Sequence, residues 1–77
     1  MDIQSFIINE ISKTLEIPDI DINKKFEELG GDSLAVVEIR GEINNKYNVD
    51  VDYSTFLDKT VREICDIYMA KIAQKGK

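Results

Sequence analysis

The stretch Leu29–Ile43 reads L-G-G-D-S-L-A-V-V-E-I-R-G-E-I, and the rest of the chain is best interpreted outward from it. Two glycines lead into Asp32 and Ser33, and an amphipathic segment follows at once. Glycine permits a tight turn, and aspartate and serine are favoured where helices begin. The pattern therefore predicts an exposed serine hydroxyl at the start of a helix. This hydroxyl either only caps the helix or is recognised by another protein.

The predicted helix runs from Ser33 to about Tyr47 and has two different faces. At about 100° per residue, its larger apolar residues gather in a sector of roughly 80°, which we expect to face the core. This core face consists of Val36, Ile39, Ile43 and Tyr47. Leu34 and Val37 fall outside the sector, on the side of Ser33 and Gly41.

The side of the helix that carries Ser33 is a candidate docking patch. Isolated exposed apolar residues are normal on protein surfaces, so Leu34 and Val37 alone would mean little. Beside an exposed hydroxyl, they favour a surface that another protein contacts. Gly41 costs roughly 1 kcal/mol relative to alanine in a helix interior, and this cost is easier to understand if another molecule approaches closely there.

The composition argues against catalysis and against nucleic-acid binding. The 77 residues suffice for a single domain, residues 1–77, with one small core and no deep cleft. The net charge of −5, from 15 acidic and 10 basic residues, disfavours a phosphate-backbone binder. Histidine is absent, so the usual general base of serine and cysteine hydrolases and the commonest transition-metal ligand are missing. We expect no catalytic residue, no metal site and no nucleic-acid partner.

Cysteine content and hydropathy indicate a cytoplasmic protein. Cys65 is the single cysteine, and its place in an apolar helical pattern predicts a buried, unreactive thiol. No apolar run approaches the roughly 18 residues needed to cross a bilayer, and the N-terminus lacks the basic and apolar regions of a signal peptide. We expect neither a membrane partner nor processing.

A first helix is predicted from about Asp2 to Leu15, with Asp2 as its cap. Its apolar stripe is Ile3, Ile7, Ile11 and Leu15, widened by Phe6 and Ile8. Pro18 prevents continuation of the helix, and residues 18–31 are predicted to form a long loop held to the core by apolar side chains. These side chains are Ile20, Ile22, Phe26 and Leu29. A short helical turn within Lys24–Leu29 is compatible with this loop.

The same loop begins like a calcium-binding loop but does not continue as one. Asp19, Asp21 and Asn23 alternate as the first ligands of such a loop do. The sixth position is Lys24 where glycine is needed, and the twelfth is Gly30 where a bidentate glutamate is needed. We interpret the acids as solvated turn formers.

The remaining elements complete an all-α pattern. Asparagines at positions 44, 45 and 48 mark the end of the second helix, and Val49–Asp52 is predicted as extended or looped chain with one or both valines turned inward. A short third helix is predicted around Tyr53–Leu57. Thr60 and Glu63 form a capping box that starts a last helix reaching about Ala73, and Lys75–Lys77 is predicted as a solvated tail. The apolar stripe of that helix is Val61, Ile64, Cys65, Tyr68 and Ile72.

These elements predict a small four-helix bundle, with three longer helices, a short third helix and a long loop between helices 1 and 2. Two motifs that also place glycine near a helix start do not occur. The phosphate-binding spacing G-x-x-x-x-G-K-[ST] is absent, and no predicted strand precedes Gly30. The nucleophile motif G-x-S-x-G is absent too. Taken alone, the glycine pair and Asp32-Ser33 are most simply a turn and a helix start.

A family resemblance changes that interpretation. The run Phe26–Leu34, F-E-E-L-G-G-D-S-L, closely resembles the attachment signature of the acyl and peptidyl carrier proteins, the phosphopantetheine-bearing carriers of fatty-acid, polyketide and nonribosomal peptide synthesis. The likeness extends over almost the whole chain, and Glu38 and Thr60–Ile64 also fit the family pattern. Gly31 is more like the polyketide and peptidyl carriers than the fatty-acid ones.

Three positions depart from relatives. Lys59 stands where many have proline before the closing helix, which concerns only the entry to that helix. Arg40 and Gly41 stand where fatty-acid carriers have larger apolar residues, so partner contacts carried over from those relatives do not transfer there. The starting methionine and the lack of a linker favour a free-standing protein over a module of a synthase.

The resemblance implies that Ser33 is the substrate of a phosphopantetheinyl transferase, which would attach 4′-phosphopantetheine from coenzyme A to its hydroxyl. Asp32 would help hold the metal of that transferase, and Leu34 would adjoin the cofactor. The expected partner surface consists of Leu34, Val37, Glu38, Gly41 and Glu42. Its partners would be the transferase, an acyl- or aminoacyl-loading enzyme and downstream synthase or modifying enzymes, with the carrier itself a monomer.

Two alternatives to a polyketide or nonribosomal peptide carrier stay open at this point. The first is a carrier in fatty-acid synthesis. The second is a helical adaptor that carries nothing, in which Asp32-Ser33 only caps a helix. If Ser33 is itself the cap, the adaptor predicts that Ser33→Ala costs about 0.5–2 kcal/mol of stability and nothing else.

Overall fold

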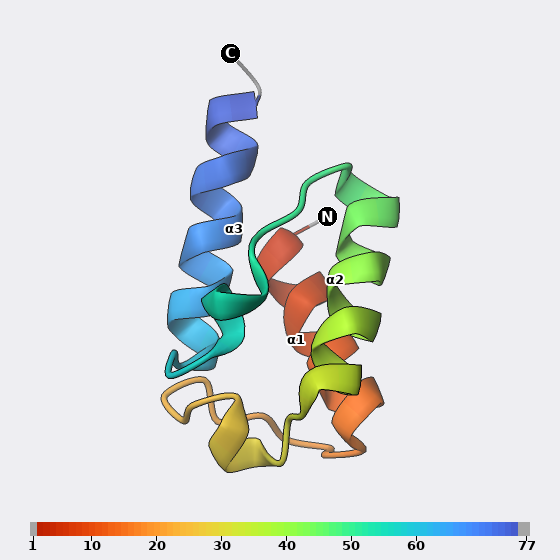
Figure 1. The fold of residues 1–77 in the computed structure, drawn as a ribbon, viewed down its shortest axis with the longest axis vertical. Helices are drawn as coiled ribbons and strands as arrows, with labels where there is room; N and C mark the ends of the chain where they lie inside the picture. The colour runs from red at the N-terminus through yellow and green to blue at the C-terminus, as the bar shows by residue number, and fades with distance from the viewer. Residues whose placement is uncertain (1, 76–77) are drawn as a thin grey trace.

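The computed structural model describes residues 2–75, which form three α-helices and two short 3₁₀ helices (Figure 1). Their bounds are α1 Ile3–Leu15, η1 Glu27–Leu29, α2 Ser33–Tyr47, η2 Tyr53–Phe56 and α3 Val61–Lys75. The predicted all-α bundle with its long first loop is confirmed. The short third helix is a 3₁₀ helix, and the helical turn expected within Lys24–Leu29 is η1.

Helix α1 packs against both α2 and α3, which lie on either side of it in Figure 1. The Asp2 side chain caps α1 by accepting a hydrogen bond from Gln4 N at 3.1 Å, as predicted. The helix ends at Glu16, whose left-handed backbone (φ 58°) lets its N–H donate to Ser12 O. One buried charge was not predicted: Glu10, within α1, is 7% exposed and pairs with Lys13 at 3.3 Å.

The long loop after α1 is tied to the entry of α3. Phe26 N donates to Lys59 O at 3.1 Å, and Val61 N donates to Lys24 O at 3.0 Å. Lys25 Nζ also pairs with Asp58 at 2.5 Å. Backbone hydrogen bonds between the two segments therefore supplement the apolar side chains that the sequence indicated. In Figure 1 this region closes the end of the bundle at which α2 begins.

The core is built around a chain of aromatic rings. Phe56 makes edge-to-face contacts with Phe26 and with Tyr68, at centroid distances of 5.3 and 6.3 Å. Val49 and Val51, on the segment between α2 and η2, are both buried as predicted. The chain between α2 and η2 thus contributes to the core although it has no regular structure.

The start of α3 has the predicted capping box. Thr60 N donates to Glu63 Oε1 at 2.8 Å, and Glu63 N donates to Thr60 Oγ1 at 3.1 Å. The helix continues to Lys75, beyond the predicted end near Ala73, a difference within the usual uncertainty of helix ends. The predicted tail at Lys75–Lys77 is wrong for Lys75, and residues 76 and 77 lie outside the described residues.

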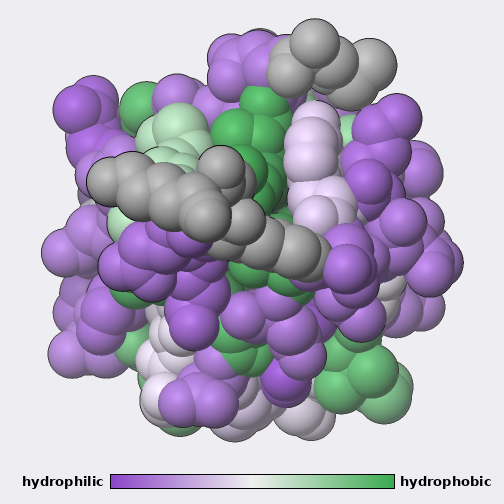
Figure 2. Space-filling view, turned by 90° about the horizontal axis from the view of Figure 1, so that it is seen from above, coloured by the Kyte–Doolittle hydropathy of each residue, from purple (hydrophilic) through white to green (hydrophobic). Residues whose placement is uncertain are grey.

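Figure 2 looks onto the opposite end of the bundle. The described surface there is mostly hydrophilic, with hydrophobic residues visible only in limited areas. Within residues 2–75, no helix combines the length and apolar character that crossing a membrane requires.

Candidate functional site

The turn that leads into α2 requires both of its glycines, for different reasons. Gly30 ends η1 with a φ of +92°, a conformation that side chains disfavour. Gly31 lies against the ring of Phe26, and a Cβ added at Gly31 would overlap three of the ring carbons. Gly31 N also donates to Phe26 O at 3.1 Å. The core residue Phe26 therefore fixes where the turn ends and α2 starts.

Asp32, and not Ser33, is the N-cap of α2. Asp32 Oδ1 accepts a hydrogen bond from Ala35 N at 2.9 Å, and Asp32 O accepts one from Val36 N at 3.0 Å. Ser33 is the first residue of the helix and is exposed. Within residues 2–75 its hydroxyl has no hydrogen-bond partner. The variant of the adaptor hypothesis in which Ser33 itself caps the helix is therefore wrong.

The start of α2 offers a favourable place for an anion. Among the described residues, no acceptor is found for the backbone N–H groups of Ser33 and Leu34, which open the helix. Free amides and the positive end of the helix dipole both favour negative charge at this point. The negative charge of Asp32 disfavours a second anion at this point. One oxygen of its carboxylate already accepts a hydrogen bond from Ala35 N. A phosphate ester on the Ser33 hydroxyl fits this local structure.

The two predicted faces of α2 are confirmed. Leu34 and Val37 are 75% and 61% exposed, and Gly41 is exposed with open space where a Cβ would lie. Glu38 and Glu42 are exposed as well. On the other face, the core positions are at most 2% exposed at Val36, Ile39 and Ile43, whereas Tyr47 is half-buried against Phe6.

Two surface hollows border the outward face of α2 on the α1 side. One, of about 280 Å³, lies beside the helix start between Thr14, Gly30 and Leu34. The other, of about 410 Å³, is lined by Glu38 and Glu42 of α2 and by the paired Glu10 and Lys13 of α1. Within residues 2–75, no group of three or more histidine, cysteine, aspartate or glutamate residues is arranged to hold a metal ion.

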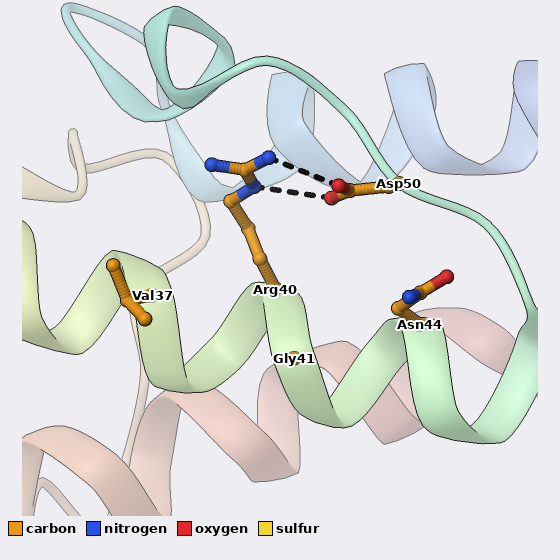
Figure 3. Close-up of a pocket in the computed structure, with 5 residues that line it drawn as sticks. All are labelled: Val37, Arg40, Gly41, Asn44 and Asp50. Atoms are coloured by element: carbon orange, nitrogen blue, oxygen red, sulfur yellow. Dashed lines mark hydrogen bonds and ion pairs between the residues drawn. The ribbon is translucent and has the colours of Figure 1, made fainter.

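The structure also brings together residues that the sequence did not connect. Arg40, on α2, donates from Nε and Nη2 to the two carboxylate oxygens of Asp50, both at 3.0 Å (Figure 3). The hydrogen bond from Arg40 lowers the pKa of the Asp50 carboxyl below its ordinary value of 3.8. Tyr53 and Leu57, in and just after η2, are 39% and 45% exposed. The Arg40–Asp50 pair could not be recognised from spacing in the sequence, because its two residues lie on different segments.

Comparison with known proteins supports the family assignment. No curated protein sequence matches the chain. The fold resembles a chain of the solved complex of the phosphopantetheine transferase Sfp with coenzyme A and a peptidyl carrier protein, with a TM-score of 0.81 over 91% of this chain and 92% of that one. Sequence identity is 15%, so this likeness shows the fold alone.

The family model described as "phosphopantetheine attachment site" matches residues 5–67, which include all of α2 and the turn before it. This match argues against the alternative hypothesis of a helical adaptor that carries no cofactor. The chain belongs to the phosphopantetheine attachment family and is a phosphopantetheine-bearing carrier protein without catalytic activity of its own.

Proposed function

We propose that Ser33 is the residue that takes the phosphopantetheine, and that residues 1–77 form one carrier domain serving polyketide or nonribosomal peptide synthesis. The observation that supports the proposal is that capping of α2 and the exposed hydroxyl belong to two different residues, Asp32 and Ser33. Asp32 caps the helix by accepting from Ala35 N, and the adjacent Ser33 hydroxyl is exposed and unpaired among the described residues. A hydroxyl in this state is available to an enzyme at no cost to the fold.

The attachment step follows from the chemistry of that hydroxyl. Ser33 Oγ forms a bond to the phosphorus of coenzyme A that carries the pantetheine, 3′,5′-ADP leaves, and the hydroxyl proton passes to a base of the transferase. Asp32 uses only Oδ1 for capping, which leaves Oδ2 for the Mg²⁺ of the transferase. The capping contact at the same time holds the carboxylate in position beside Ser33.

Backbone groups at the start of α2 then favour the phosphate of the modified serine at that position. The free amides of Ser33 and Leu34 favour the phosphodiester at the helix N-terminus. When attached, the group supplies a terminal thiol that forms thioesters with acyl or aminoacyl groups. Cys65 does not compete with it, because that thiol is 1% exposed and its pKa is raised to about 11, chiefly by burial.

The partner surface is the outward face of α2. Leu34, Val37 and the bare backbone at Gly41 offer an apolar contact, and Glu38 and Glu42 add negative charge along its edge. Such a surface suits enzymes that present an apolar contact flanked by basic residues. These partners would be the transferase, a loading enzyme and downstream synthase or modifying enzymes. The solved complex of a peptidyl carrier protein with a transferase is consistent with this arrangement.

Two observations favour polyketide or nonribosomal peptide synthesis over fatty-acid synthesis. Gly31 matches the signature of the former carriers, and in the structure it is required by contact with Phe26. Arg40 and Gly41 replace the larger apolar residues of fatty-acid carriers, and Arg40 is engaged by Asp50.

The attachment site is tested by incubating the protein with coenzyme A, Mg²⁺ and a broad-specificity phosphopantetheinyl transferase. Intact mass should show the addition of one phosphopantetheinyl group, and fragmentation should place it on Ser33. The other serines of the chain serve as internal controls for the site of modification. Ser5 and Ser12 donate hydrogen bonds to Asp2 and Ile17, whereas Ser54 is exposed as Ser33 is. Failure of several transferases to modify the protein, or modification at Ser54, would contradict the proposal.

The pathway is tested separately. Protein isolated from its native cell should carry an acyl or aminoacyl group that hydroxylamine releases from the arm, and mass spectrometry of the released product identifies its class. An amino acid or an oxygenated acyl chain supports the proposal. A series of saturated acyl chains would assign the carrier to fatty-acid synthesis instead.

A further inference from the structure

Phe26 joins the turn before α2 to two other parts of the molecule. Its side chain is 2% exposed and makes an edge-to-face contact with Phe56 at a centroid distance of 5.3 Å. Its backbone N–H donates to Lys59 O at 3.1 Å, which ties Phe26 to the segment that leads into α3. The position of Phe26 is therefore fixed both by the core and by the entry of the last helix.

The same residue holds Gly31 in two ways. Phe26 O accepts hydrogen bonds from Leu29 N and Gly31 N, both at 3.1 Å. The Phe26 ring lies so close to Gly31 that a Cβ there would overlap three ring carbons. Gly31 has no positive φ, so it is the ring and not the backbone conformation that excludes a side chain at this position. Phe26 thus determines where the chain leaves the turn.

Ser33 follows Gly31 by two residues and is held by few other contacts. Asp32, the residue between them, caps α2 through Ala35 N. Ser33 itself is exposed, and its hydroxyl is unpaired among the described residues. The first buried residue of α2 is Ala35. The place of the Ser33 hydroxyl is set on one side by the capped helix and on the other by the contact between Gly31 and Phe26.

This placement matters for the transfer of phosphopantetheine, because the reacting atoms must be aligned. Ser33 Oγ bonds to the phosphorus that carries the pantetheine, the bond from that phosphorus to 3′,5′-ADP breaks, and the hydroxyl proton passes to a base of the transferase. The attacking and leaving oxygens of such a transfer lie roughly in line. A misplacement of about 1 Å can lower the rate by roughly 100-fold.

We infer that Phe26 is a positioning residue for the modification of Ser33 and that it acts through Gly31. The inference rests on the proposed attachment at Ser33. Because Phe26 is buried, a transferase bound to the outward face of α2 does not contact it. Loss of the ring should therefore lower the kcat of modification and leave the KM for the carrier nearly unchanged.

Two buried rings of the same row provide a matched test. Phe26→Leu removes the ring against Gly31, whereas Tyr68→Leu removes an equally buried ring that contacts Phe56 on its other side. Modification by the transferase is followed by intact mass, at a temperature at which circular dichroism shows each variant to be folded. Phe26→Leu should lower kcat by about tenfold or more, and Tyr68→Leu by less than about twofold. Equal losses of kcat, or an effect on KM alone, overturn the inference.

A double-mutant cycle tests the link through Gly31. Gly31→Ala should lower kcat by about tenfold, because its methyl group displaces the ring. In the Phe26→Leu background the smaller side chain leaves room for that methyl group, so the same substitution should change kcat by less than about threefold. Equal changes in the two backgrounds contradict the inference. If Phe26→Leu does not fold, Gly31→Ala decides alone, and an unchanged kcat in the folded variant refutes the positioning role.

Fragmentation of the modified wild type separates this inference from the proposed attachment. A wild type that carries no phosphopantetheinyl group on Ser33 refutes the attachment itself. A wild type modified on Ser33, with a kcat that does not respond to Phe26→Leu, refutes only the positioning role of Phe26.

Discussion

The two faces of α2 differ in almost every property although they belong to one helix of 15 residues. Val36, Ile39 and Ile43 are at most 2% exposed and face α1 and the core. Leu34 and Val37 are 75% and 61% exposed and share their side with Ser33. Because successive residues turn by about 100°, one helix can hold the fold together and present a modification site without compromise between the two. The following experiments test how complete this separation is.

The largest expected effect is on the inner face. Ile39→Ala removes a side chain with no exposed surface and should lower the free energy of unfolding by about 2–5 kcal/mol. Val37→Ala, two residues earlier on the outer face, should change it by less than about 0.5 kcal/mol. Urea unfolding followed by circular dichroism measures both. Equal losses for the two variants would break the distinction between the faces.

The two glycines Gly31 and Gly41 should respond to alanine with opposite signs. Gly31→Ala forces Phe26 out of its place in the core and should destabilise by about 1–3 kcal/mol. Gly41→Ala meets open space and should stabilise by roughly 1 kcal/mol through helix propensity. Thermal unfolding of both variants checks the signs. A destabilising Gly41→Ala would mean that the glycine has a structural role that the contacts do not reveal.

Two substitutions of Asp32 distinguish its role in capping α2 from its role in the modification of Ser33. Asp32→Ala removes the acceptor for Ala35 N and should cost about 1 kcal/mol. Asp32→Asn keeps a side-chain oxygen for the cap but loses the charge, so it should restore stability while modification by the transferase stays impaired. If Asp32→Asn is modified as efficiently as the wild type, the carboxylate has no part in holding the metal.

A smaller effect concerns the buried thiol. Burial, reinforced by the charges of Asp66 and Asp2, raises the pKa of Cys65 from its ordinary value of 9.0 to about 11. The folded state thus favours the protonated thiol, so its contribution to stability is complete below pH 9 and is lost as the pH rises from about 9 towards 11. Unfolding measured across this range should show the loss, and Cys65→Ala should reduce it. The pKa of the Tyr68 phenol is raised too, chiefly by burial, and adds a similar loss at higher pH.

Native thiol labelling gives an independent check on the same residue. The apo protein should show no reactive thiol near pH 8, and the holo protein should show one, which belongs to the arm. Rapid labelling of the apo protein would mean that Cys65 is accessible.

The fold and the position of the serine were predictable from local patterns. Helical periodicity located the inner face of α2, and capping chemistry located Asp2 and the box at Thr60 and Glu63. These features depend on residues within one or two turns of each other, which is why a single sequence reveals them. The cap of α2 was ambiguous because Asp32 and Ser33 both suit that position, and only the backbone geometry distinguishes them.

What the sequence did not predict depends on contacts between distant segments. The Arg40–Asp50 pair and the hydrogen bond between Phe26 and Lys59 both join parts of the chain that meet only after folding. The packing of Gly31 under Phe26 is close in sequence, but it depends on a ring whose place is set by Phe56. Such relations have no fixed spacing, so they required the structure.

Ser33→Ala tests the central claim most directly, because it removes only the hydroxyl from the outer side of α2. The variant and the wild type are compared by urea unfolding and by intact mass after incubation with coenzyme A and the transferase. We predict a free energy of unfolding within about 0.5 kcal/mol of the wild type, together with complete loss of phosphopantetheinylation. A variant that still gains one phosphopantetheinyl group would contradict the assignment of Ser33, and a large loss of stability would contradict the division between the two faces.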